Sequence, residues 1–243
     1  MKAIKYIPVF AIFTLFMACT TAQISTALKT ASEVLTESDD PSTSEVSAGL
    51  REALINGVSN GVDLTSKLDG YFKNPEIKLP FPPEIVQVET KLRQLGLNKP
   101  VDDFILSINR AAEKAAVEAK PIFIGAIKTM TVSDAWALLK GNETAATDYL
   151  KKNTTDDLQA KFQPVIKNSL DNADATKYYN DMIGIYNKVP FVKKVETDLP
   201  EYVTGLAMDG LFLLVAREEA KIRKDPIART SELLKKVFGY KAQ

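Results

Sequence analysis

The stretch that decides the fold is Val203-Thr-Gly-Leu-Ala-Met-Asp-Gly-Leu-Phe-Leu-Leu-Val215. Residues 203, 206, 207, 210, 211, 214 and 215 recur at the spacing of one face of an α-helix and form a continuous apolar stripe. Residues 208, 212 and 213 are apolar on the other side. Because a helix that is apolar nearly all round lies in the interior, we predict a central buried helix over residues 199–224.

Helical periodicity continues toward both ends of the chain. Residues 50, 53, 54, 58, 61 and 62 form one buried face, and residues 108, 111, 112, 115, 116 and 119 form a face of nearly all small side chains. No long stretch alternates with the period of a strand. We therefore predict an all-α fold, a bundle-like single domain over residues 45–243. Its further helices are expected at 84–95, 100–119, 143–152, 155–171, 174–188 and 227–238.

Several local signals mark where helices end. Thr131 followed by Asp134 resembles a capping box, and Gly141 should end the helix that this box begins. Gly96 should end the helix before it. Residues 74–83 contain four prolines, which remove backbone donors, so this segment is predicted to run extended, either across the surface or between helices.

The amino terminus has the layout of a secretory signal peptide. Lys2 and Lys5 precede an apolar run over residues 7–17, which is too short to span a membrane. One interpretation is a lipoprotein signal over residues 1–18 that is cleaved before Cys19, whose thiol then carries the lipid. The alternative is an ordinary cleavage after Ala22. Thr20 favours sorting to the outer membrane by analogy with bacterial lipoproteins, so we expect the protein on the periplasmic side of that membrane, or soluble in the periplasm on the alternative.

Residues 19–44 are rich in small and polar side chains and are predicted to form a tether between lipid and domain. A short helix over residues 24–35 is compatible with this. Without Lys2 and Lys5 the remaining chain has 29 basic and 31 acidic residues. This balance argues against a nucleic-acid partner, because such domains carry a clear positive excess. The expected partners are the membrane, through the lipid, and an envelope protein.

The sequence lacks most residue types that carry catalysis or bind metals. It has no histidine, and Cys19 is its only cysteine, so zinc and iron sites and a histidine-assisted nucleophile are not expected. Gly57-Val-Ser-Asn-Gly61 matches a serine-hydrolase pattern but lies in a predicted helix. Residues 171–174 resemble the start of a calcium loop, without its glycine and final glutamate, and are predicted to form a turn. We predict no catalytic residue, metal or cofactor and regard an enzyme as the less favoured class.

Three polar features remain. Asp209 is the only charged residue between residues 205 and 216. If it is buried it needs a partner, so it either contacts a ligand or forms a structural bond to a cation or a helix terminus. Asn109, Arg110 and Glu113 lie together opposite the alanine face. They form either part of a functional site or a solvent-exposed polar stripe, in which Arg110 and Glu113 pair. Residues 218–229 are dense in charge, with Glu219 and Arg223 one helical turn apart, which is typical of an exposed helix end.

The chain resembles a family of exported helical bacterial proteins known as domain of unknown function number four-one-nine-seven, over about residues 45–239. The stretches that carry the resemblance are 49–54, 72–77 with 79–80, 109–113, 119–123, 209–213, 222–226 with 228–230, and 235–239. This resemblance implies no activity. It does imply recurring polar positions, which are our candidates for ligand or partner binding: Asn74, Asn109, Arg110, Glu113, Lys120, Asp209, Arg223, Asp225 and Arg229.

Three hypotheses for function follow. The first is a non-catalytic envelope lipoprotein that binds a partner protein or organises the outer membrane. The second is a binder of lipid or another apolar ligand, which requires a cavity of several hundred Å³ between helices. The third is an enzyme that uses carboxylates and arginines, which requires residues such as Asp209 and Arg110 to converge in one cleft.

Overall fold

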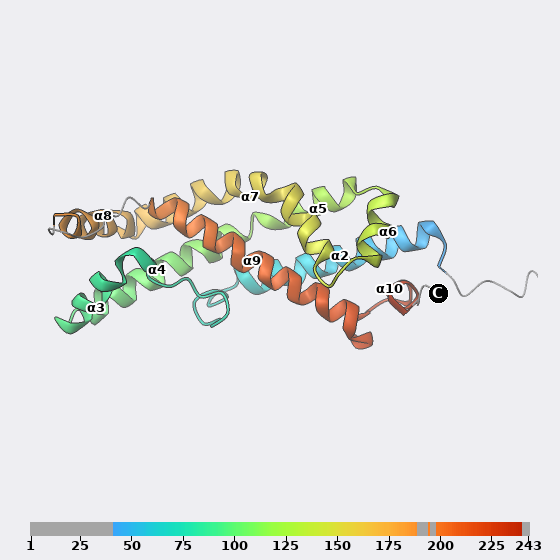
Figure 1. Ribbon diagram of the computed structural model, residues 1–243, viewed down its shortest axis with the longest axis horizontal. Coiled ribbons are helices and arrows are strands. Elements are labelled where there is room, and N and C mark those ends of the chain that lie inside the picture. Colours follow the sequence, from blue (N-terminus) through green and yellow to red (C-terminus); the bar gives the residue numbers. More distant parts are fainter. Residues whose placement is uncertain (1–40, 189–193, 195–197, 240–243) are drawn as a thin grey trace, which may run out of the picture. The chain divides into compact units, whose positions relative to one another are not determined.

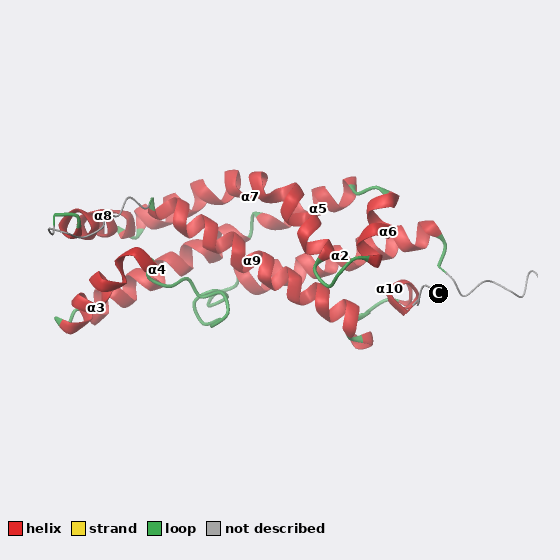
Figure 2. Ribbon diagram, in the orientation of Figure 1, coloured by secondary structure: helices red, strands yellow, loops and turns green. Residues whose placement is uncertain are grey.

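A computed structural model describes residues 41–188, 194 and 198–239. The regular structure of these ranges is helical, and they contain no strand (Figures 1 and 2). The all-α, bundle-like fold is thus confirmed. The signal peptide, Cys19 and the possible helix over residues 24–35 lie outside the described residues. The elements are α2 (Thr43–Ser66), η1 (Pro83–Ile85), α3 (Val86–Gln94), α4 (Asn98–Ala116), α5 (Ala119–Thr129), α6 (Val132–Lys140), α7 (Ala145–Asn172), α8 (Ala175–Tyr186), α9 (Leu199–Lys224), η2 (Pro226–Ala228) and α10 (Glu232–Gly239).

Helix α9 is the central element, as predicted, and it packs against α2, α4 and α7 (Figure 1). It has the predicted bounds of residues 199–224. It is not buried all round, however: every fourth residue from Glu201 to Lys221 is exposed, which leaves one narrow stripe in solvent. By length and composition α9 passes the test for a membrane-spanning helix, but 56% of its apolar window is buried in the domain, as in a core helix.

The small face of α4 is fully buried. Ala111, Ala112, Ala115 and Ala116 have no exposed surface, and neither has Ala119, which the structure places at the start of α5. Helix α4 packs against both α7 and α9. Short side chains reduce the distance between helix axes, which explains why so many alanines occur at this crossing. Larger side chains, including Tyr71, Phe123, Phe162 and Tyr179, fill the rest of the core.

The predicted helix ends are confirmed at most positions. Thr131 and Asp134 form a reciprocal capping box at the start of α6, and Gly141 is the C-cap of that helix. Gly96 ends α3 with a φ of +81°, a conformation that glycine adopts without steric cost. A second capping box, Ser42 with Glu45, starts α2 at Thr43, so the helical domain begins two residues before the boundary we expected.

Two predicted helices, 143–152 and 155–171, are in fact one. Helix α7 runs without interruption from Ala145 to Asn172. The polar break that we assigned at residues 153–154 is accommodated because the hydroxyls of Thr154 and Thr155 donate to the carbonyls of Leu150 and Lys151, one turn back. Pro164 also lies within α7, on its exposed side.

The last predicted helix, 227–238, is shorter than expected. Residues 226–228 form a turn of 3-10 helix, and α10 begins only at Glu232, where Ser231 Oγ accepts the backbone N–H of Leu234. Helix α10 then packs against α2, with Leu234 and Val237 fully buried. The last described turn is therefore part of the core.

Candidate functional site

Asn109 of α4 binds the backbone of the proline-rich segment. Its side chain is fully buried. Its Oδ1 accepts the N–H of Leu79 at 2.9 Å, and its Nδ2 donates to the Leu79 carbonyl at 2.9 Å. The amide thus pairs with both polar groups of one residue, as a neighbouring strand would do. At Leu79 the proline-rich segment therefore runs along α4, and Leu79 itself is buried.

Glu113, one turn further along α4, holds the preceding loop. Its Oε1 accepts the backbone N–H groups of Tyr71 and Phe72, and its Oε2 accepts from Arg110 at 2.6 Å. Arg110 also pairs with Asp69 at 2.6 Å. The side chains of Asn109 and Glu113 are buried, so this face of α4 contacts the loop and is not a solvated stripe.

Tyr71 links the same loop to α9. Its ring is fully buried, and its hydroxyl donates to the carbonyl of Ala207 in α9 at 2.6 Å. Burial, with a contribution from the nearby Glu113 charge, raises the pKa of Tyr71 well above its usual value. Tyr71 therefore stays protonated and acts as a bridge between the loop and α9.

Asn74 and Lys120 have smaller roles. The Asn74 side chain accepts the N–H of Glu76 at 3.1 Å, which stabilises a local turn in the same loop. Lys120 pairs with Asp63 at 3.5 Å, where the Lys120 side chain is about half-buried and that of Asp63 is largely exposed. Neither residue lines any of the three pockets described below.

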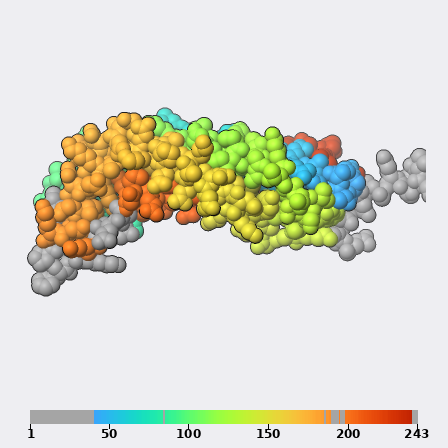
Figure 3. All heavy atoms as spheres, turned by 90° about the horizontal axis from the view of Figure 1, so that it is seen from above, coloured from blue at the N-terminus to red at the C-terminus, as the bar shows by residue number. Residues whose placement is uncertain are grey.

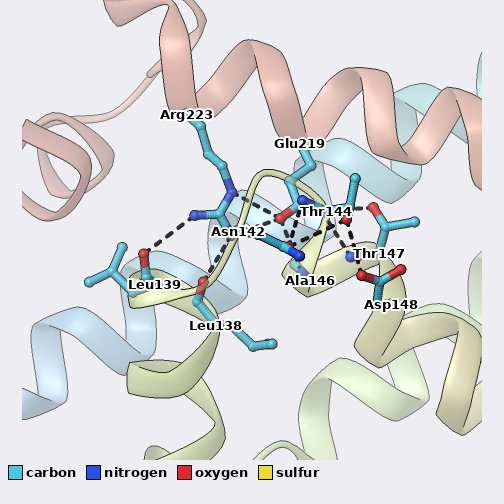
Figure 4. Close-up of polar contacts among 9 residues, drawn as sticks. All are labelled: Leu138, Leu139, Asn142, Thr144, Ala146, Thr147, Asp148, Glu219 and Arg223. Carbon is cyan, nitrogen blue, oxygen red and sulfur yellow. Dashed lines mark hydrogen bonds and ion pairs between the residues drawn. The ribbon is translucent and has the colours of Figure 1, made fainter.

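The charge-dense end of α9 binds the turn between α6 and α7 (Figure 4). The Glu219 carboxylate accepts the backbone N–H groups of Ala146 and Thr147 and the Thr147 hydroxyl, at 2.7–3.0 Å. These N–H groups belong to the first turn of α7, where no intrahelical acceptor is available. Glu219 therefore caps the start of α7 from a different helix.

Arg223 completes the same network. It pairs with Glu219 at 2.7 Å and donates to the carbonyls of Leu138 and Leu139, the last turn of α6. A cation at a helix C-terminus and an anion at a helix N-terminus both oppose the local helix dipole. Only 7% of the Glu219 side chain and 13% of the Arg223 side chain are exposed, so this face of the helix end is buried. Lys221, Lys224 and Asp225 are exposed, as we expected for the charge-dense segment.

Asp225 and Arg229 close the end of α9. Asp225 is its C-cap and accepts the N–H of Ile227 at 2.9 Å. Arg229 turns back and donates to the carbonyls of Ile222 and Arg223. Arg229 thus satisfies carbonyls that the end of α9 would otherwise leave without a partner, and Asp225 caps the 3-10 turn that follows.

Asp209 lies on the exposed stripe of α9. Its side chain is 69% exposed and is 3.7 Å from Lys151 of α7. The two residues border a shallow groove of about 270 Å³ between α7 and α9, with Phe212 and Met208 beside them. These two helices adjoin one another in Figure 3, where α7 is yellow to light orange and α9 is dark orange.

The nine candidates therefore do not meet in one pocket. Asn109, Arg110 and Glu113 hold the loop before α3, whereas Arg223, Asp225 and Arg229 organise the end of α9. Arg110 and Asp209 share no contact partner, so the convergence that an enzyme of this kind requires is not formed. A small void of about 20 Å³ next to Glu219 and Arg223 has room for about one water molecule.

The structure contains a larger cavity that the sequence did not reveal. It has a volume of about 570 Å³, is partly open, and lies between α3, α4 and α8. Its walls are mostly apolar, with two carboxylates and the hydroxyl groups of Ser107 and Tyr178 among them. The lining residues are Phe81, Leu92, Pro100, Val101, Asp103, Phe104, Ser107, Ala173, Ala175, Tyr178, Asp181 and Met182.

The geometry of this cavity suits an amphipathic guest. Phe81 and Phe104 pack with ring centroids 5.0 Å apart on one wall, and Phe104 stacks on Tyr179 behind it. Asp103 and Asp181 lie on α4 and α8, and both are exposed to solvent. Apolar walls with a few polar groups at the margin, at this volume, are typical of small-molecule sites.

No cluster of three or more potential metal-binding side chains occurs among the described residues. A family model described as "Protein of unknown function (DUF4197)" matches residues 40–239. The chain belongs to this family. The match spans every helix described above and begins just before α2.

No curated protein and no solved structure matches the chain. The candidate site of this DUF4197 protein therefore rests on the geometry of its own described residues. In that geometry the polar residues that we had singled out mainly hold the fold together, and the cavity between α3, α4 and α8 is the largest of the three pockets described above.

Proposed function

We propose that this protein is a cell-envelope lipoprotein, anchored through Cys19, whose helical domain binds the apolar chain of an amphipathic ligand. The observation that supports the ligand is the cavity of about 570 Å³ between α3, α4 and α8. Its volume is within the range of about 300–1,000 Å³ for small-molecule sites, and its walls are aromatic and aliphatic. Burial of a ligand chain in such walls stabilises the complex by about 0.8 kcal/mol per CH₂ group.

This proposal changes the order of our hypotheses. Binding of a partner protein, or organisation of the outer membrane, stays a prediction without a defined surface. An enzyme based on carboxylates and arginines loses its motivation, since Arg110 and Asp209 take part in different contacts. The anchor at Cys19 and the location at the outer membrane remain part of the proposal.

The ligand proposal is tested by titration with N-phenyl-1-naphthylamine, a neutral probe whose fluorescence increases in apolar surroundings. The protein used is the chain from residue 19 onward with Cys19→Ser, which contains every residue of the described core. We expect saturable binding, and competition by long-chain amphipaths.

Two tryptophan variants make the test specific for the cavity. Ala173→Trp introduces a large side chain into the lining, whereas Ala160→Trp places the same side chain elsewhere on the exposed surface of α7. Loss of binding in the first variant and not in the second supports the proposal. Equal probe binding by both variants, or no saturable binding by the parent chain, contradicts it.

Lipidation has a separate test. Mass spectrometry of the protein extracted from membranes should find a diacylated or triacylated amino terminus at Cys19. An unmodified chain that starts at Gln23 contradicts the anchor and leaves the cavity proposal intact.

A further inference from the structure

The turn between α3 and α4 carries an exposed apolar tip. All residues from Gln94 to Pro100 are exposed. Leu95 exposes 75% of its surface and Leu97 exposes 43%. These two leucines lie one residue apart on a single short turn, in a domain that buries most of its aliphatic side chains. We call residues 94–100 the tip.

The conformation of the tip does not require Leu95. The N–H of Gly96 binds the carbonyl of Arg93, and the N–H of Leu97 binds the carbonyl of Leu92, which is the standard glycine-terminated helix end. In that motif Gly96 is needed for its positive φ, and an apolar residue at position 97 commonly packs back on residue 92. Position 95 has no such role, so an exposed leucine there has no explanation within the fold.

The tip forms one edge of the cavity. Leu92 and Pro100, which flank the turn on its two sides, both line the cavity between α3, α4 and α8. Exposed apolar surface therefore continues from the tip into the apolar wall. Such a contiguous patch marks an interaction site more strongly than scattered single side chains do.

The charges around the tip are compatible with lipid headgroups. Between Gln94 and Pro100 the only charged residue is Lys99, and Lys91 lies just before the tip. The two acidic side chains that follow are paired: Asp102 with Arg93 at 2.9 Å and Asp103 with Lys99 at 2.5 Å. Because Lys99 is itself paired with Asp103, the outermost residues, 94–98, present apolar and uncharged polar groups, with Lys91 as the basic side chain beside them. This composition is compatible with entry into a membrane interface.

We propose that the tip inserts into a lipid surface and delivers the chain of a membrane amphipath directly into the cavity. This inference rests on the proposed function, because it supplies the route by which an apolar ligand enters. A chain that passes along Leu95 and Leu97 into the cavity avoids exposure to water, whose cost increases with each CH₂ group.

The test uses the chain from residue 19 onward with Cys19→Ser and vesicles of phosphatidylethanolamine and phosphatidylglycerol. Flotation measures the bound fraction. We expect the double variant Leu95→Ser, Leu97→Ser to bind vesicles at least about tenfold more weakly than the parent chain, because two leucines leave the lipid. The matched control is Leu68→Ser, since Leu68 is 74% exposed but does not line the cavity.

A thiol probe locates the contact. With Cys19 replaced, Asn98→Cys gives a single thiol at the tip, and Lys67→Cys gives one at an exposed position next to Leu68. A nitrobenzoxadiazole label should brighten with vesicles at position 98 and not at position 67. Equal responses at the two positions, no vesicle binding by any chain, or undiminished binding by the double variant overturns the proposal. Protection of position 98 by envelope proteins without lipid also overturns it, in favour of a protein partner.

The two proposals can fail independently. Probe binding in the absence of vesicles reports on the cavity alone. Leu95→Ser by itself should leave it within about twofold of the parent value, because Leu95 is largely exposed and does not line the cavity. If the protein binds the probe but not vesicles, the proposed membrane route is wrong and the ligand proposal stands. If the protein binds vesicles but not the probe, the ligand proposal is wrong and the contact of the tip with the membrane stands.

Discussion

At the scale of single residues, the buried carboxylates Glu113 and Glu219 accept hydrogen bonds from backbone N–H groups. Glu219 accepts three hydrogen bonds from the start of α7, and Glu113 accepts two from the loop at Tyr71. Both carboxylates also pair with an arginine of the same helix. A buried charge that is both paired and hydrogen-bonded avoids most of the cost of leaving water, which explains why these acids are tolerated in the core.

We predict that Glu219→Gln lowers the free energy of unfolding by about 2–4 kcal/mol, measured by urea denaturation at neutral pH. The amide keeps the size of the side chain, but it removes the charge opposite Arg223 and turns an NH₂ group toward backbone donors. The control is Glu143→Gln, which alters an exposed ion pair with Lys224 and should leave the unfolding midpoint unchanged. Similar midpoints for the two variants would show that the network adds little to stability.

At the scale of elements, Gly57 on α2 and Gly210 on α9 differ in how much space a larger side chain would have. A Cβ atom at Gly57 would lie 3.7 Å from Glu218, an ordinary contact. A Cβ atom at Gly210 would lie 2.8 Å from the ring of Tyr71, which is fully buried and held by its hydroxyl. Only the second glycine is required by close packing.

We therefore predict opposite effects of the same substitution. Gly57→Ala should raise the free energy of unfolding by about 0.5–1 kcal/mol, since alanine favours helix more than glycine does. Gly210→Ala should lower it by about 1–3 kcal/mol, because Tyr71 has no space to move. Thermal and urea denaturation of the two variants provide the measurement, and destabilisation by Gly57→Ala would contradict the packing described for α2.

At the scale of the whole described domain, the first helix, α2, contacts the last helix, α10. Lys236 of α10 pairs with Glu45 in the first turn of α2 at 2.8 Å. This hydrogen bond, together with those from Ser42, lowers the pKa of Glu45 from 4.5 to about 2. Because the pKa is lower in the folded state, ionised Glu45 stabilises the fold above about pH 4.5, and the contribution is lost as the pH falls toward about 2.

This linkage predicts a difference between variants in acid. The Tm of the parent chain should fall more steeply than that of Glu45→Gln between about pH 4.5 and pH 2, and the two values should converge at the lower limit. Calorimetry at a series of pH values measures it. Glu232→Gln, which alters an exposed pair within α10, serves as the control and should follow the parent curve. Parallel curves for parent and Glu45→Gln would mean that the contact is absent in solution.

The candidate site shows where prediction from sequence ended. The polar residues 109, 110 and 113 were found, but the sequence left open whether they were solvated, because the loop that they hold lies 30–42 positions away in the chain. Asp209 was singled out for its apolar neighbours in sequence. In the fold it lies on the one stripe of α9 that no other helix covers.

The sequence by itself determined the helical class, the bounds of α9, the capping box of α6 and the ends at Gly96 and Gly141. These features depend on residues within about one helical turn of each other, so local spacing is sufficient to predict them. The tertiary structure alone decided the capping of α7 by Glu219 and the cavity lined by Leu92, Phe104 and Met182. Both depend on how three distant helices pack, and packing is set by the combined shape of their faces, which no single stretch of sequence contains.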